Sequence, residues 1–182
     1  LNIFDTPVEK RFDSITSRAC LALNVPIAAI SLIDSDRQWF KSAQGLDVSE
    51  TARNLSFCAH TINEAESMVI PDATKDERFK NNALVTGDPS IRFYAGIPLT
   101  APNGVRIGAL CAIDSVSRNF SADEIKILQD LGREVDEELK RASTLPKTTQ
   151  KIDPKNRSPL IDPVTRLWNR LGAELWLQSE WE

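Results

Sequence analysis

Residues 91–114 read IRFYAGIPLTAPNGVRIGALCAID, and this stretch decides the fold. Apolar side chains alternate along both of its halves, as they do on a half-buried β-strand. The first half would place on one face Phe93, Ala95, Ile97 and Leu99. The second half would place on one face Val105, Ile107, Ala109, Cys111 and Ile113. Between them, Asn103-Gly104 is a preferred tight turn, so the stretch predicts an antiparallel hairpin.

A second hairpin is predicted nearer the N-terminus. Residues 27–33 are apolar and rich in β-branched side chains, and residues 38–43 follow after a polar turn and end before Gly45. A brief strand is expected at 68–70, where Pro71 stops it. Strands joined by tight turns pair antiparallel, so we expect an α+β fold with a central antiparallel sheet of five to six strands.

Amphipathic helices are predicted at both ends of this region. Near the N-terminus, Thr6 and Glu9 have the spacing of a capping box, and Pro7 suits the first position of a helix. Before the second helix, Ser121 and Glu124 have the same capping-box spacing. The first apolar stripe consists of Val8, Phe12, Ile15, Ala19 and Ala22. The second consists of Leu128, Leu131, Val135 and Leu139, in a helix ending near residue 142. The two helices are expected to cover one face of the sheet together.

The middle of the chain is irregular. Short helices are expected at 56–64 and 76–81, within polar segments that run from 49 to 89. Residues 72–89 are the longest of these polar stretches, and a loop this long in a compact domain is usually functional or mobile. These segments must cover the second face of the sheet, and a cavity between sheet and loops is the natural place for a ligand.

Composition excludes several classes of protein. The chain has 182 residues, a net charge of −4 and three cysteines, Cys20, Cys58 and Cys111. Nothing provides the basic surface that nucleic acid demands, and no apolar run is long enough for a membrane helix. A sparse, odd set of cysteines is typical of reduced thiols, so a cytoplasmic protein is expected. Since residue 1 is not methionine, we also expect a piece of a longer protein.

Residues 1–143 resemble the GAF family of sensory domains, which is related to the PAS family. The resemblance rests on FDTP at 4–7, DRQWFKS at 36–42, SFCAH at 56–60, DAT at 72–74 and IRFYAG at 91–96. It implies terminal helices on one face of the sheet, with loops and short helices on the other. It also implies regulation by a small molecule or relay of a signal, without catalysis in this chain.

The tail resembles a second family. Residues 144–160 contain Pro146, Pro154 and Pro159 and predict a linker. Residues 162–170, DPVTRLWNR, are similar to the opening of GGDEF domains, with departures at Val164 and Arg166. Residues 161–182 would then be the N-terminal fragment of a diguanylate cyclase-type output domain. The chain contains no Gly-Gly pair, so the signature of that family is not present. We expect this chain to make no cyclic di-GMP.

Four residues are the predicted ligand contacts: Cys58, His60, Arg92 and Tyr94. Cys58 and His60 stand two positions apart, which could ligate a metal, but no further ligands are recognisable, so neither a metal nor a cofactor is expected. Packing is the simpler interpretation of both residues. Arg92 and Tyr94 alternate with the helix-facing side chains and should face the cavity. The alternative for Arg92 is an ion pair with Asp72 or Asp76.

Three functions remain open from sequence. The first is a sensory domain that binds an unidentified small molecule and controls its own C-terminal output domain. The second is a thiol enzyme of the methionine sulfoxide reductase type, which needs a reactive cysteine pair. The third is a structural module that only dimerises. In each case we expect a homodimer formed through the terminal helices, with Leu128, Val135 and Leu139 as the surplus apolar stripe.

Overall fold

A six-stranded antiparallel sheet forms the centre of the protein in the computed structural model, which describes residues 3–144. The strands are β1 (Ile27–Ile33), β2 (Arg37–Gln44), β3 (Glu50–Ala52), β4 (Met68–Ile70), β5 (Phe93–Thr100) and β6 (Arg106–Asp114). Their order across the sheet is β3-β2-β1-β6-β5-β4. The helical segments are α1 (Lys10–Leu23), η1 (Arg53–Leu55), α2 (Cys58–Thr61), α3 (Ala83–Thr86) and α4 (Ala122–Thr144). The predicted α+β fold is confirmed.

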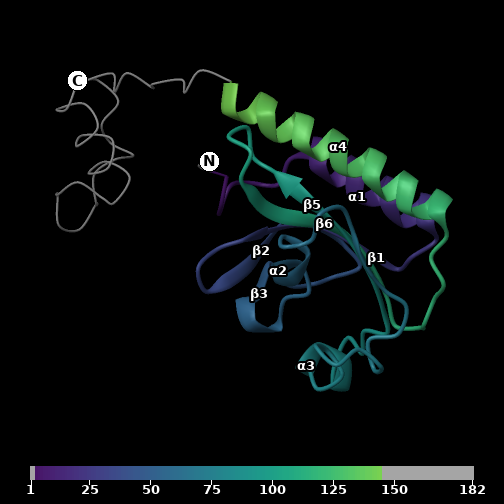
Figure 1. The fold of residues 1–182 in the computed structure, drawn as a ribbon. Helices are drawn as coiled ribbons and strands as arrows, with labels where there is room; N and C mark the ends of the chain where they lie inside the picture. The colour runs from purple at the N-terminus through teal and green to yellow at the C-terminus, as the bar shows by residue number, and fades with distance from the viewer. Residues whose placement is uncertain (1–2, 145–182) are drawn as a thin grey trace, which may run out of the picture. The chain divides into compact units, whose positions relative to one another are not determined.

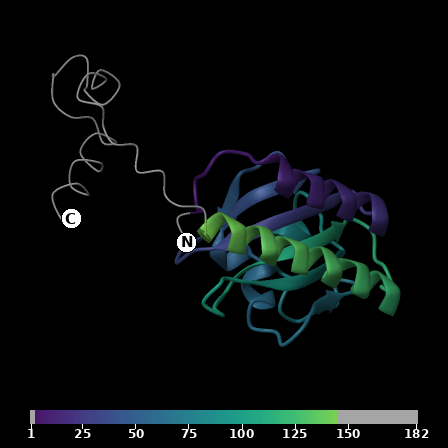
Figure 2. The ribbon, with the colours of Figure 1, turned by 90° about the horizontal axis from the view of Figure 1, so that it is seen from above.

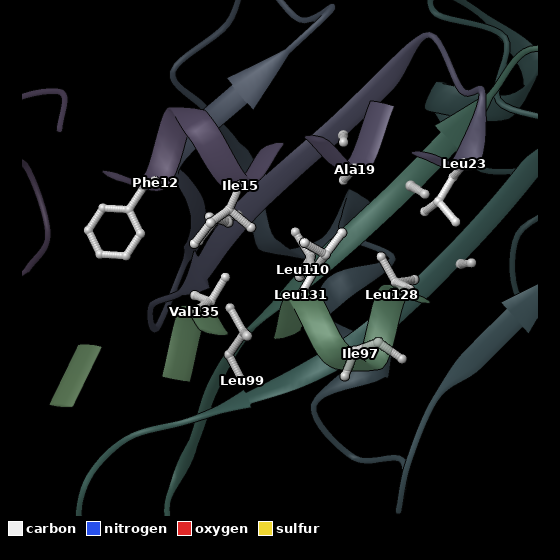
Figure 3. Close-up of a cluster of buried hydrophobic side chains, with 14 of the residues drawn as sticks. Phe12, Ile15, Ala19, Leu23, Ile97, Leu99, Leu110, Leu128, Leu131 and Val135 are labelled. Atoms are coloured by element: carbon white, nitrogen blue, oxygen red, sulfur yellow. The ribbon is translucent and has the colours of Figure 1, made fainter. Parts of the chain in front are cut away.

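Helices α1 and α4 lie side by side on one face of the sheet (Figures 1 and 2). Leucine, isoleucine and valine side chains of both helices interlock with those of β5 and β6 (Figure 3). Full burial of each such side chain contributes about 1.5–3 kcal/mol. Two ion pairs also join the helices, Arg18 to Glu134 at 2.5 Å and Arg11 to Glu138 at 3.1 Å. This layer therefore holds the N- and C-terminal helices as one unit.

The start of α1 differs from the prediction. The helix begins at Lys10, after Glu9 in an extended conformation with no side-chain cap, so the predicted capping box does not form. Thr6 instead accepts a hydrogen bond from Lys41 Nζ, and Glu9 pairs with the same ammonium group at 2.6 Å. Because this charge is fully buried, it binds the oxygens that would have capped the helix. Val8 consequently lies outside the core, and Ala22 is exposed as well.

The decisive hairpin forms as predicted, with Ala95 opposite Ala112 and Gly104 at a φ of 83° in the turn. One detail was wrong. The register shifts after Leu99, and Ile107 packs with the helix-side core instead of sharing a face with Cys111. A one-residue bulge reverses the side on which a side chain points.

The second face carries its own apolar core beneath the irregular middle of the chain. Phe57 stacks on Phe79 with ring centroids 4.0 Å apart, and Tyr94 of β5 packs against Phe57. The helix expected at 76–81 is a series of turns. The helical turn comes later, at α3, where the Asn82 side chain accepts a hydrogen bond from Leu84 N. The prediction that loops and short helices cover this face is confirmed.

The stripe expected to face a second copy is buried inside the chain. Leu128, Val135 and Leu139 are at most 1% exposed, because they pack on the sheet and on α1. Most of the predicted linker, 144–160, and the whole predicted fragment 161–182 lie outside the described residues. No helix between residues 3 and 144 combines the length and apolar character needed to span a membrane.

Candidate functional site

A cavity of about 370 Å³ lies on the loop-covered side of the sheet. Its apolar wall comes from the sheet and from the segments that cover it, with Phe40 on β2, Phe57 before α2, Leu84 on α3 and Ile113 on β6. Pockets for small molecules usually have volumes of about 300–1,000 Å³ and mainly apolar walls with a few polar groups. The cavity has the size and lining of such a site.

Two uncharged polar side chains stand next to each other in the wall. Gln38 of β2 lies directly opposite Thr51 of β3, and both line the cavity. The Gln38 oxygen accepts a hydrogen bond from the Ser56 hydroxyl. The Thr51 hydroxyl oxygen is buried and has no hydrogen-bond partner among the described residues. A buried polar atom without a partner costs about 1–3 kcal/mol, so a ligand group that reached this hydroxyl would remove that penalty.

Sequence reasoning missed both residues. Residues 49–53 are polar and show no strand pattern, yet 50–52 form the edge strand β3 and residue 53 begins η1. A three-residue strand gives too short an alternation to be recognised. Gln38 did carry a weak signal, because it alternates with Phe40 on a predicted strand and so shares its face.

Two acidic side chains, Asp47 and Asp88, also line the cavity and are exposed, which places them at its mouth. Neither forms a hydrogen bond or ion pair with any residue in the range 3–144. The lining described for the cavity contains no lysine, arginine or histidine. Its polar groups are therefore neutral or negative.

Of the four predicted contacts, Cys58 and Tyr94 line the cavity. Tyr94 Oη lies 2.7 Å from Thr61 Oγ1 and donates to Cys58 Sγ over 3.3 Å. Burial raises the pKa of Tyr94 well above its usual value, so the phenol keeps its proton. The structure brings these two residues together. Whether they touch a ligand stays a prediction.

His60 and Arg92 are not among the residues of the cavity wall. His60 is exposed and sets its ring edge against Phe79, 4.9 Å between centroids. Arg92 turns back on its own loop, where Nη1 donates to the carbonyl oxygens of Val85, Ser90 and Ile91. Arg92 therefore does not face the cavity, and it does not form the alternative ion pair with Asp72 or Asp76, so both expectations were wrong. The loop holds the Arg92 guanidinium instead, because three carbonyl oxygens lie within 3.1 Å of its Nη1 atom.

The two buried cysteines on this side of the sheet are neighbours. A hydrogen bond from the Cys111 thiol lowers the pKa of Cys58 despite its burial, and hydrogen bonds from Ser31 and Tyr94 act in the same direction. The same bond to Cys58, together with burial, raises the pKa of Cys111. Cys58 is thus the thiol that ionises first. Within residues 3–144, no group of three or more His, Cys, Asp or Glu side chains is arranged to hold a metal ion.

Comparison with known proteins identifies a family and a curated relative for this chain. The family model for the GAF domain matches residues 7–139. A curated protein from Pseudomonas aeruginosa, named a cyclic di-GMP phosphodiesterase, is 37% identical over 175 residues. That alignment covers 96% of this chain but only 28% of the length of the relative.

Several solved structures share the fold at low sequence identity. The GAF domain of a phosphoenolpyruvate-protein phosphotransferase from Acinetobacter is 18% identical at a TM-score of 0.58, covering 72% of this chain and 81% of its own. Free methionine-R-sulfoxide reductase from Neisseria meningitidis is also 18% identical at 0.58, covering 72% and 78%. The PixJ GAF domain from Thermosynechococcus elongatus is 13% identical at 0.58, covering 74% and 85%. The matched family model and the antiparallel sheet with its two-helix layer together show that this chain belongs to the GAF family.

Proposed function

We propose that residues 3–144 form a regulatory domain that binds a small molecule in the cavity and passes that event to an output domain acting on cyclic di-GMP. The observation that carries the proposal is the buried hydroxyl of Thr51, which has no partner among residues 3–144 and belongs to the wall of a cavity of about 370 Å³. A structural module gains nothing from such a group, since its burial opposes folding.

The proposed route of the signal runs through the sheet. In β6, Cys111 and Ile113 face the cavity-side core, while Leu110 and Ala112 face the core beneath α1 and α4. A change in the cavity that shifts β6 would therefore press on both helices. Helix α4 reaches Thr144, where the predicted linker begins. Close-packed interiors transmit such shifts because they hold few voids.

Two features support an output domain of cyclic di-GMP metabolism. The Pseudomonas aeruginosa relative is named as a phosphodiesterase for this nucleotide, and its alignment covers 96% of the present chain. Residues 162–170 resemble the opening of GGDEF domains, which implies synthesis instead. The two features agree on the nucleotide and differ on the reaction. Measuring both cyclic di-GMP formation from GTP and its hydrolysis by the natural full-length protein decides between them.

Ligand binding is tested by blocking the mouth of the cavity. Val48 lines the cavity and is 51% exposed, and Val105 in the β5–β6 turn is 55% exposed but lies elsewhere. We expect V48W to lose a small molecule that wild type and V105W retain, as seen by native mass spectrometry after purification under gentle conditions. If all three proteins carry the same added mass, or none carries an added mass, the binding proposal is wrong.

A second candidate function rests on Cys58 and Cys111, two thiols buried in the same cluster on the cavity side of the sheet. Two thiols can reduce methionine sulfoxide, which yields a Cys58–Cys111 disulfide, methionine and water. A thiol with a lowered pKa beside a second thiol suits this reaction, and Cys58 borders the cavity. Incubation with free methionine sulfoxide and a dithiol reductant tests it. Methionine formation by wild type, absent in C58S and C111S, would favour the enzyme over the sensor.

Self-association through α1 and α4 remains a prediction. Because the stripe of Leu128, Val135 and Leu139 is buried, an interface would have to use outward side chains such as Leu21 and Ile127. Light scattering at high micromolar concentration tests this: wild type should be dimeric, and a monomer would exclude the interface.

A further inference from the structure

The charge around the cavity points to a class of ligand. Resting on the proposed sensory function, we propose that the cavity binds a small organic amine, with its apolar or aromatic body inside and its ammonium group at the mouth. Asp47 and Asp88 line this mouth and are free of ion pairs and hydrogen bonds among residues 3–144. An ammonium group placed there would meet negative charge that no cation among the described residues already neutralises.

An anionic ligand meets the opposite situation. The cationic side chains next to lining residues in the sequence are already engaged: Arg92 binds three loop carbonyls, Lys41 pairs with Glu9, and Arg37 pairs with Asp5 and Glu50. A phosphate or carboxylate entering the cavity would lose water and approach two aspartates without gaining a cationic partner in the described lining. Burying a charge without a partner is strongly unfavourable. Arg92, held by these loop carbonyls, is therefore not placed to pair with an anion in the cavity.

The interior suits the body of such an amine. Phe40 and Phe57 present aromatic rings, and Leu84 and Ile113 add aliphatic surface. Thr51 Oγ1 can accept a hydrogen bond from an N–H group that reaches inside, which would satisfy its unpaired oxygen. The volume of about 370 Å³ lies near the lower end of small-molecule pockets, which favours a one-ring ligand over a dinucleotide.

Matched probes of opposite charge test the inference on the 182-residue chain. Phenethylamine and 3-phenylpropionate share a ring and a two-carbon spacer and differ in the sign of the terminal group. Binding is followed by two-dimensional NMR through the Gln38 side-chain amide and the Thr51 backbone amide. We expect phenethylamine to shift both signals and to bind at least about tenfold more tightly than 3-phenylpropionate, because oppositely charged groups attract and like charges repel.

Variants then assign the selectivity to the two aspartates. D47N and D88N should each weaken phenethylamine by about two- to fivefold, the range of exposed ion pairs. The control E137Q removes one negative charge from the exposed side of α4, away from the cavity, and should change nothing.

The outcomes separate this inference from the sensory function. If 3-phenylpropionate binds as tightly as phenethylamine, or if E137Q weakens the amine as much as D47N and D88N do, the amine class is wrong while the cavity remains a binding site. If neither probe shifts the Gln38 and Thr51 signals, the amine class is also wrong. The sensory proposal fails separately, when V48W, V105W and wild type all carry the same bound mass or none of them carries one.

Discussion

Gln38 and Thr51 face each other across the β2–β3 pair, and only the first of them has its side-chain oxygen hydrogen-bonded. The Thr51 hydroxyl is buried in a residue that lines the cavity, and no group in the described part of the chain forms a hydrogen bond with it. Native proteins seldom tolerate such an atom, and those that remain often mark a ligand or water site. This pair therefore links the short edge strand β3 to the proposed function.

Replacing the Thr51 hydroxyl by a methyl group should stabilise the empty protein. T51V keeps the shape and removes the penalty of an unpaired polar atom, so we expect the free energy of unfolding to rise by up to about 1 kcal/mol in urea titrations. T61V is the matched control, because Thr61 is fully buried and hydrogen-bonded to Tyr94. It should lose about 1 kcal/mol or more. Equal losses in both variants would mean that the Thr51 hydroxyl has a partner in solution.

The pairing of Glu9 with the buried Lys41 ammonium predicts a pH dependence. Although partial burial opposes it, hydrogen bonds from Lys41 and Arg11 lower the pKa of Glu9 from its ordinary 4.5. A lowered folded pKa means that the stabilisation is present above about pH 4.5 and disappears as the pH falls through the folded value. E9Q should therefore cost about 1 kcal/mol at pH 7 and progressively less in acid.

Unfolding free energies of wild type and E9Q between pH 7 and pH 3 test this expectation. E137Q, on the exposed side of α4, serves as the control and should follow wild type throughout. A constant difference between wild type and E9Q across this range would show that the carboxylate charge of Glu9 does not stabilise the fold.

Gly108 is required by the close approach of β6 to β1. A methyl group at this position would overlap the carbonyl oxygen of Ser31, a backbone atom that cannot move aside cheaply. We expect G108A to lose about 2–3 kcal/mol of unfolding free energy, as overpacked cores do. G104A, at an open turn position with a φ of 83°, should lose about 1 kcal/mol from backbone strain alone. Thermal and urea unfolding measure both, and a loss at Gly108 no larger than at Gly104 would contradict the packing argument.

Much of the fold was predictable because its signals are local. The alternation in residues 91–114 and the turn at Asn103-Gly104 fix the β5–β6 pair, and the spacing of Phe12, Ile15 and Ala19 fixes the buried side of α1. The start of α1 was not predictable, since it depends on Lys41, a residue distant in sequence whose buried charge engages Thr6 and Glu9.

The site was harder to predict than the fold, because it depends on contacts between residues that are far apart in the sequence. Tyr94 and Cys58 could be placed at the cavity from strand alternation and motif position. Arg92 shares the alternation of Tyr94, but its long side chain reaches loop carbonyls that no sequence pattern brings together. Asp47, Thr51 and Asp88 come from three loop or edge segments, and only the folded chain brings them to one cavity.

The central claim is that a small molecule in this cavity controls a cyclic di-GMP output domain. The most direct measurement is cyclic di-GMP turnover by the natural full-length protein, with and without a small-molecule extract of its own cells, in wild type, V48W and V105W. The account predicts that the extract changes turnover in wild type and V105W but not in V48W. An equal response in all three proteins, or no response in wild type, would contradict it.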